Sequence, residues 1–207
     1  MRLKLKALTE PSAESNPDPN PNGSAVKILT FDLGNGSEVV YIPKFFPFNQ
    51  AWNWFDYLNN EIPWSRPTIR VFGRSCVQVH EALPGSSFNS LLLNRYKGGN
   101  DCVGWHSDDE KLYGSTPEIA SVSFGCEREF FLKKKPSKRS HVSKERGEEP
   151  ASKRSKKSSH TDQHSFTLKH GSLLVMRGNT QRDWLHSVPK RAKVEATRIN
   201  LTFRHVV

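Results

Sequence analysis

The sequence predicts a mainly β protein with one flanking helix, arranged as a sandwich or barrel. Only residues 44–64 show the spacing of an amphipathic helix. Nearly all later apolar runs are short, rich in β-branched and aromatic residues, and bounded by Gly, Pro or polar turns. Many closely spaced strands beside a single helix favour a sandwich or barrel over alternating βαβ units.

The helix is predicted from four apolar side chains. Trp52, Phe55, Leu58 and Ile62 recur at helical spacing, and the pattern stops at Pro63. We therefore expect an amphipathic helix that packs on a flat surface.

The predicted strands follow this helix along the chain. Each is a short run that alternates or clusters apolar residues between turn signals. They cover residues 68–73, 89–96, 102–108, 119–125, 128–134, 165–170, 172–178 and 197–206.

Two segments are expected to lie outside the folded core. Residues 1–25 form a predicted disordered leader, because the stretch 9–24 carries four prolines and almost no apolar side chains. The rest, 26–207, is predicted to be a single domain with a basic disordered insertion at 133–162. Between 133 and 159 eleven Lys or Arg residues face three Glu, which accounts for +8 of the formal net charge of +10.

The charge and composition of the chain limit the classes of function. The basic insertion favours a polyanion partner, nucleic acid first, or is simply a solvated loop. Its clusters "KKKPSKR" and "KRSKK" are typical of a two-part nuclear-import signal, so we expect a nuclear protein. No apolar run is long enough to span a membrane, and the N-terminus lacks the apolar stretch of a signal peptide. Three cysteines without CxxC spacing favour buried thiols over disulfides or a zinc site.

A metal-ligating pattern stands in "GWHSDDE". His106 and Asp108 lie two apart, so on a strand both side chains point to one face. His186 in "WLHSVP" could supply a second imidazole, and two histidines with one carboxylate form the facial triad that suits non-haem Fe(II). The alternative is a surface His-Asp pair with no metal.

The last predicted strand carries a polar stripe. Arg198, Asn200, Thr202 and Arg204 alternate with apolar residues. The stripe is either a solvated outer face or a carboxylate clamp, since a guanidinium binds a carboxylate through two hydrogen bonds. A dicarboxylate held there beside iron would be a co-substrate.

Six motifs together carry a family resemblance: "LLLNRY", "HSDDE", "PEIASVSFGCEREF", "LKHGSLLVM", "WLHSVP" and "RINLTFR". In this order they resemble the AlkB family of Fe(II)/2-oxoglutarate-dependent dioxygenases. They are most similar to its eukaryotic, plant-like homologue-two branch, which repairs alkylated bases in double-stranded DNA. The resemblance covers about residues 26–132 and 163–207 and implies a double-stranded β-helix (jelly-roll) core.

The resemblance implies a role for each matching residue. Iron would be held by His106, Asp108 and His186. 2-Oxoglutarate, which reacts with dioxygen, would be bound by Asn94, Tyr96, Arg198, Thr202 and Arg204, with Arg204 on the distal carboxylate.

The resemblance also implies a DNA-binding surface and a substrate. Asp109 and Glu110 match an acidic pair that positions the damaged base, which N-methylation makes cationic. Phe72, with Gly73 and Arg74, matches a wedge that fills the gap left by a flipped nucleotide. "PKRAKV" at 189–194 matches a basic loop expected to contact phosphates. The substrates implied are 1-methyladenine and 3-methylcytosine in duplex DNA, bound by a monomer.

The chain departs from the family after "VFGRSCVQ". A few dozen residues that form a lid over the flipped base are missing, and we infer a junction near Gln78 and Val79. Three hypotheses follow: a DNA dealkylating dioxygenase, a truncated isoform that binds DNA without repairing it, and a related dioxygenase acting on RNA or protein. The wedge and the acids of "HSDDE" argue against the third.

Overall fold

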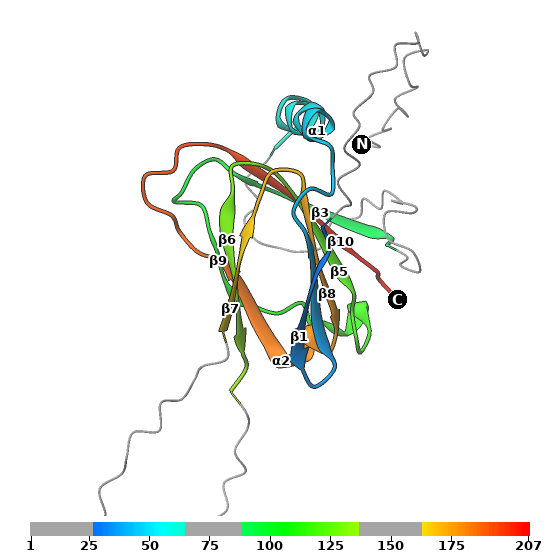
Figure 1. Cartoon of the computed structure of the whole chain (residues 1–207). Coiled ribbons are helices and arrows are strands. Elements are labelled where there is room, and N and C mark those ends of the chain that lie inside the picture. The colour runs from blue at the N-terminus through cyan, green and yellow to red at the C-terminus, as the bar shows by residue number, and fades with distance from the viewer. Residues whose placement is uncertain (1–26, 65–87, 137–162) are drawn as a thin grey trace, which may run out of the picture.

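The computed structural model describes residues 27–64, 88–136 and 163–207. Within these residues the chain forms ten strands, two α-helices and one 3-10 turn (Figure 1). In chain order they are β1 (Leu29–Gly34), β2 (Ser37–Ile42), α1 (Phe48–Glu61), β3 (Ser90–Tyr96), β4 (Val103–His106), η1 (Lys111–Tyr113), β5 (Ile119–Gly125), β6 (Arg128–Lys134), β7 (Gln163–Leu168), β8 (Ser172–Gly178), α2 (Thr180–Asp183), β9 (Trp184–Val188) and β10 (Arg198–Arg204).

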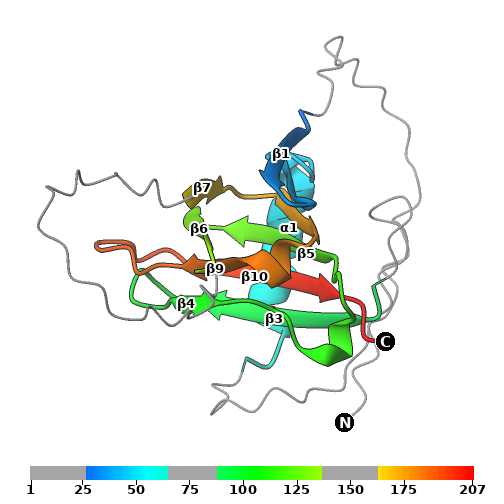
Figure 2. The ribbon, with the colours of Figure 1, turned by 90° about the horizontal axis from the view of Figure 1, so that it is seen from below.

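The strands build two antiparallel sheets that face each other. The larger sheet has the order β1-β2-β8-β5-β10-β3, and the smaller has the order β4-β9-β6-β7. Figure 2 shows the smaller sheet and β10 from below, with α1 behind the larger sheet. This arrangement confirms the predicted β-rich jelly-roll core with a flanking helix.

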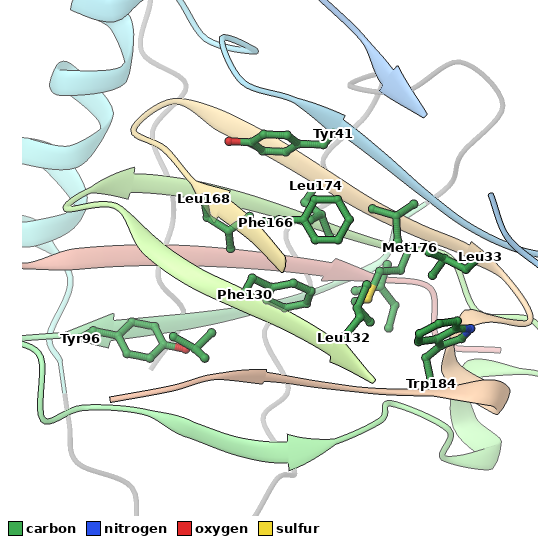
Figure 3. Packing of buried hydrophobic residues seen from close by; sticks show 13 residues of the cluster. Leu33, Tyr41, Tyr96, Phe130, Leu132, Phe166, Leu168, Leu174, Met176 and Trp184 are labelled. Atoms are coloured by element: carbon green, nitrogen blue, oxygen red, sulfur yellow. The ribbon is translucent and has the colours of Figure 1, made fainter. Parts of the chain in front are cut away.

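The apolar core has two parts, one on each face of the larger sheet. The inner part fills the space between the sheets, and the smaller sheet contributes Phe130, Phe166 and Trp184 to it (Figure 3). The outer part lies between the larger sheet and α1, where Ala51 and Leu58 are buried. Because the larger sheet is covered on both faces, β5 and β8 are buried along almost their whole length, and β8 carries a continuous apolar run from Leu173 to Met176.

The predicted helix is confirmed, but it is shorter than the predicted stretch 44–64. It runs from Phe48 to Glu61, and Ile62 already has extended backbone angles before Pro63. Leu58 is buried as the helical pattern requires, whereas Trp52 remains 38% exposed. The flat surface that it covers is formed mainly by β5 and β10.

Several predicted boundaries need correction. The strands β1, β2 and β9 were not predicted, and β4 ends at His106 rather than at residue 108. The predicted strand 128–134 is confirmed as β6, so Lys133 and Lys134, which were also counted in the basic insertion, belong to that strand.

Other predictions fall largely outside the described residues. These are the leader 1–25, the strand 68–73 and nearly all of the insertion. Among the cysteines that the structure describes, Cys102 and Cys126 are free thiols, but Cys102 is exposed and Cys126 half-buried, so the prediction of buried thiols was wrong for both. None of the described helices has the length and apolar character needed to cross a membrane.

Candidate metal and co-substrate site

A cavity of about 140 Å³ opens between the two sheets. Its lining brings together all eight residues that were predicted to bind iron and 2-oxoglutarate, although they come from four strands and one loop. The lining consists of Leu92, Asn94, Tyr96, Val103, His106, Asp108, Ile119, Ser121, Phe130, Met176, His186, Val188, Arg198, Asn200, Thr202 and Arg204.

The three predicted metal ligands form a compact cluster in this cavity. One ligand atom from each of His106, Asp108 and His186 lies within 4.8 Å of the others. The two histidines are directly opposite each other in the β4–β9 pairing, and their ring centroids are 4.1 Å apart. Two imidazoles and one carboxylate on one side of a cavity match the facial triad of non-haem iron sites.

Asp108 reaches this cluster by a route that the sequence did not indicate. It lies two residues beyond the end of β4, so shared strand geometry does not align it with His106. Instead its backbone N–H donates to Oε1 of Gln181 at 2.9 Å, and its Oδ2 accepts from Nη2 of Arg204 at 2.8 Å. Gln181 is 1% exposed and was missed in the sequence analysis, since nothing in the sequence links residues 73 positions apart.

The hydrogen bond of His106 and the burial of His186 both suit metal binding. Nδ1 of His106 lies 2.8 Å from the carbonyl oxygen of Gly104. Because that oxygen can only accept a hydrogen bond, Nδ1 carries the proton and the lone pair of Nε2 is left to bind a metal. Burial lowers the pKa of His186 to about 3, with a further contribution from repulsion by His106. Neutral imidazole is the form that binds a metal.

The polar stripe of β10 lines the cavity and is not a solvated outer face. All four of its members are at most 9% exposed. The register places Arg198 beside Tyr96 of β3 and Asn200 beside Asn94. On the other side, Ser123 of β5 lies beside Asn200 and Ser121 lies beside Thr202. A hydrogen-bonded chain runs along it: Ser121 donates to Asn200 at 2.8 Å and Asn200 donates to Thr202 at 2.7 Å.

Arg198 has unused hydrogen-bonding capacity that fits a carboxylate. Its Nη2 donates to Ser123 Oγ at 2.9 Å and to Asn200 Oδ1 at 2.8 Å. Its Nε and Nη1 are buried and have no hydrogen-bond partner within the described part of the chain. Burial lowers the pKa of Arg198 from its ordinary value, and an anion would offset that cost. The 2-oxoglutarate that the resemblance implied therefore fits this end of the cavity.

Arg204 occupies the other end of the stripe and contacts a metal ligand. Both its Nε, at 3.1 Å, and its Nη2 donate to Oδ2 of Asp108. This contact does not fit the prediction that Arg204 takes the distal carboxylate, because its guanidinium lies on the metal side. Arg198 holds the unpaired donors at the far end of the cavity.

Of the residues predicted to contact the substrate, the two that the structure describes, Asp109 and Glu110, do not line the cavity. Asp109 is exposed and accepts a hydrogen bond from Nζ of Lys135 at 2.9 Å, which holds its pKa below the ordinary value. Glu110 is exposed at the start of η1. Phe72, Gly73 and Arg74 lie outside the described residues, so the wedge stays a prediction.

Comparison with known proteins decides the family. A model described as the 2OG-Fe(II) oxygenase superfamily matches residues 73–204. A protein of Arabidopsis thaliana named DNA oxidative demethylase ALKBH2 is 56% identical over 217 residues, which take in 86% of this chain and 69% of that protein. The chain belongs to the AlkB family of 2OG-Fe(II) oxygenases.

More distant relatives match a smaller part of this AlkB-family chain. DNA oxidative demethylase ALKBH2 of Homo sapiens is 42% identical over 142 residues, 69% of this chain and 48% of that protein. Alpha-ketoglutarate-dependent dioxygenase alkB homolog 3 of Rattus norvegicus is 46% identical over 122 residues, 59% of this chain and 37% of that protein. The chain thus spans about half or less of these mammalian relatives.

The family membership fixes the cofactors of this oxygenase. The triad would hold Fe(II), and 2-oxoglutarate serves as co-substrate with dioxygen. The donor set and the two unpaired N–H groups of Arg198 both fit these groups. The chain is therefore an Fe(II)/2-oxoglutarate-dependent dioxygenase by family and by the geometry of its site.

Proposed function

We propose that this AlkB-family chain is a DNA oxidative demethylase that removes N-methyl groups from 1-methyladenine and 3-methylcytosine in duplex DNA. The observation that carries the proposal is the 56% identity, over 86% of the chain, to the Arabidopsis protein of that name. The metal triad and the cavity between the sheets supply the site at which the reaction would occur.

The chemistry requires iron, dioxygen and 2-oxoglutarate together. With Fe(II) and these co-substrates bound, the site would supply hydroxylation of the N-methyl group. 2-Oxoglutarate and dioxygen would be consumed, succinate and carbon dioxide would form, and the hydroxymethyl product would release formaldehyde. His106, Asp108 and His186 would hold the metal. Gln181 fixes Asp108 from its backbone side and Arg204 fixes the carboxylate, so the ligand set is held in place before substrate arrives.

Arg198 is the group that we assign to the distal carboxylate of 2-oxoglutarate. Its free Nε and Nη1 can donate two charge-assisted hydrogen bonds. Tyr96, whose ring lies 4.9 Å from the guanidinium carbon, would orient the same carboxylate, while Asn94 and Thr202 line the path toward the metal. Arg204 would then orient the metal end of the co-substrate.

Asp109 and Glu110 are proposed to select a cationic base. Lys135 holds the pKa of Asp109 down, so this carboxylate stays ionised at neutral pH. N-methylation at the Watson–Crick edge leaves adenine or cytosine positively charged, and an ionised carboxylate attracts that form over the unmodified base.

DNA would approach across basic surface near the cavity. Lys190 and Lys193 are exposed on the loop 189–194, where phosphate contacts would supply salt-dependent affinity. Phe72 would act as the wedge that fills the gap left by the flipped base. We further propose that the protein acts as a monomer and that it resides in the nucleus.

A second candidate function is DNA binding without repair. The alignment with the Arabidopsis protein runs over 217 positions, and 86% of 207 residues is about 178, so about 39 positions belong to the relative alone. This difference favours the predicted internal junction near Gln78 and Val79. Loss of an aromatic lid would remove base stacking of roughly 1–3 kcal/mol and lower repair while leaving the metal site intact.

The test uses the full chain with Fe(II), 2-oxoglutarate, oxygen and a duplex that contains one 1-methyladenine. Restoration of adenine with release of formaldehyde supports the demethylase, and Asp108→Ala serves as the inactive control. Succinate formed without base repair supports the second candidate. Absence of both succinate and repair, in a protein shown to be folded, would contradict both.

A further inference from the structure

Arg128 is a buried cation that does not line the cavity. It is the first residue of β6 and is only 1% exposed. Among the described residues it has no ion-pair partner. Its two Nη atoms donate to backbone carbonyls, and its buried Nε has no hydrogen-bond partner in the described part of the chain. Nη2 donates to Asp101 O at 2.8 Å and to Pro189 O at 2.6 Å, and Nη1 donates to Gly98 O at 3.3 Å.

These carbonyls belong to two loops that are far apart in sequence. Residues 97–102 connect β3 to β4, and residues 189–197 connect β9 to β10 and carry the basic stretch. The loops are also joined to each other directly: the Gly99 N–H donates to Val194 O at 2.6 Å and the Arg191 N–H donates to Gly99 O at 2.9 Å. Arg128 therefore fastens the basic loop to the protein from inside.

Arg128 also touches the co-substrate end of the cavity. Its guanidinium carbon lies 5.5 Å from the ring centroid of Tyr96, and that of Arg198 lies 4.9 Å from the same ring. Two buried guanidinium groups thus share one aromatic ring. Arg128 is close enough for its charge to contribute to the lowered pKa of Arg198, although burial contributes more.

A carboxylate bound at Arg198 would change the charge balance of this pair of arginines. It brings negative charge to a pair of cations that have no anionic partner among the described residues, so it relieves their repulsion. Arg128 should therefore favour the bound dicarboxylate. Binding free energies are reciprocal, so the bound dicarboxylate must equally favour the conformation in which Arg128 sits against Tyr96 and holds both loops.

We propose that Arg128 is a positioning residue that couples 2-oxoglutarate binding to the order of the basic loop at 189–194. The inference rests on the co-substrate carboxylate lying at Arg198, and it requires neither DNA nor turnover. An enzyme built this way holds its basic loop more firmly when the co-substrate is in place than when the site is free.

The test measures amide hydrogen exchange of the loop by mass spectrometry. Full-length protein is loaded with Mn(II), which binds the site without supporting turnover, and compared with and without 2-oxoglutarate. The reporting amides are those of Gly99 and Arg191, which cross between the loops, and peptides from β1 and β2 at the far edge of the sheet serve as internal controls. We expect 2-oxoglutarate to slow exchange in 97–101 and 189–195 by about fivefold or more, within the usual range of coupling.

Three variants separate positioning from general stability. Arg128→Gln removes the charge, Arg128→Lys keeps it but cannot reach three carbonyls, and Arg177→Gln is the matched control, since Arg177 pairs with surface Glu118 and Glu38 instead. In both Arg128 variants we expect loss of the 2-oxoglutarate-dependent slowing and about tenfold weaker 2-oxoglutarate binding. Mn(II) affinity should stay within about twofold of that of the unmodified chain.

The outcomes distinguish this inference from the assignment of the co-substrate site. If 2-oxoglutarate binds the unmodified chain but leaves exchange of both loops unchanged, the coupling is refuted even if no Arg128 variant folds. If Arg128→Gln only lowers the melting temperature and keeps co-substrate affinity and protection, Arg128 is structural and the proposal is wrong. If the unmodified chain does not bind 2-oxoglutarate, the co-substrate assignment fails first and the coupling with it.

Discussion

Replacing Arg198 by Gln should separate co-substrate binding from folding. In the free protein this guanidinium is buried, and two of its N–H groups have no partner within the described residues. In the complex those groups would donate to the distal carboxylate of 2-oxoglutarate. The substitution therefore removes a favourable contact from the bound state and an unpaired buried charge from the free state.

The size of the effect follows from the two free donors of Arg198. Hydrogen bonds to charged groups contribute about 1.5–3 kcal/mol each, so two are worth about 3–6 kcal/mol. A glutamine amide can recover one neutral bond of about 1 kcal/mol, which leaves a net loss of about 2–5 kcal/mol. We expect 2-oxoglutarate affinity to fall by about 30-fold to 4000-fold. Stability of the free protein should change by no more than about 1 kcal/mol, because removal of a buried cation without an anion offsets the loss of its hydrogen bonds to Ser123 and Asn200.

The assay pairs calorimetric titration of 2-oxoglutarate, in the presence of Mn(II), with chemical unfolding of the free protein. Arg177→Gln removes an equal charge from a surface ion pair and should leave both quantities near those of the unmodified chain. Binding by Arg198→Gln within about threefold of the unmodified chain would refute the assignment. A large loss of stability in the free protein would show that Arg198 is mainly structural.

Three further substitutions test other parts of the structure. Gln181→Leu removes the acceptor for the Asp108 N–H, so Mn(II) affinity measured by titration should fall by about 10–100-fold, and an unchanged affinity would show that Gln181 does not support the triad. Burial lowers the pKa of His170, whose Nδ1 accepts from the Gly125 N–H, so stability is complete above its unfolded pKa of about 6.5 and declines as the pH falls below it. His170→Asn keeps a hydrogen-bond acceptor but does not titrate. The free energy of unfolding in urea should therefore differ less between about pH 7.5 and about pH 5.5 than it does in the unmodified chain. An equal difference would contradict this assignment. Gly99→Ala would drive its Cβ into the backbone of the facing basic loop and should destabilise the protein by about 1–3 kcal/mol in the same unfolding assay, whereas full stability would mean that the loops separate freely.

The sequence predicted best where the relevant physics is periodic. The apolar pattern of α1 and the polar stripe of β10 follow directly from 3.6-residue and two-residue repeats. The stripe left one ambiguity, because alternation alone does not say which face is solvated. That choice was made by the second sheet, which covers the face of Arg198 and Arg204 and converts a surface pattern into a cavity wall.

The sequence predicted less where contacts join distant segments. β1 and β2 escaped notice because "LTFDLG" and "SEVVYI" are short and carry charge. They pair with each other, and the place of this hairpin in the sheet depends on the pairing of β2 with β8, more than 130 residues later. Gln181 lies in the one-turn helix α2, which directly precedes β9, and no sequence pattern marks it as part of a site. Its importance arises from the fold, which brings it to Asp108.

The two arginines of β10 show how the same spacing yields different roles. In sequence Arg198 and Arg204 are equivalent members of one stripe, and a resemblance by motif assigned the distal carboxylate to Arg204. In the structure Arg204 is neutralised by Asp108 at the metal end, whereas Arg198 shares Tyr96 with a second buried cation and keeps two donors free. An anion is stabilised most where positive charge is buried and unpaired. The carboxylate of the co-substrate should therefore be stabilised more strongly at Arg198, at the far end of the cavity, than at Arg204, at the metal end.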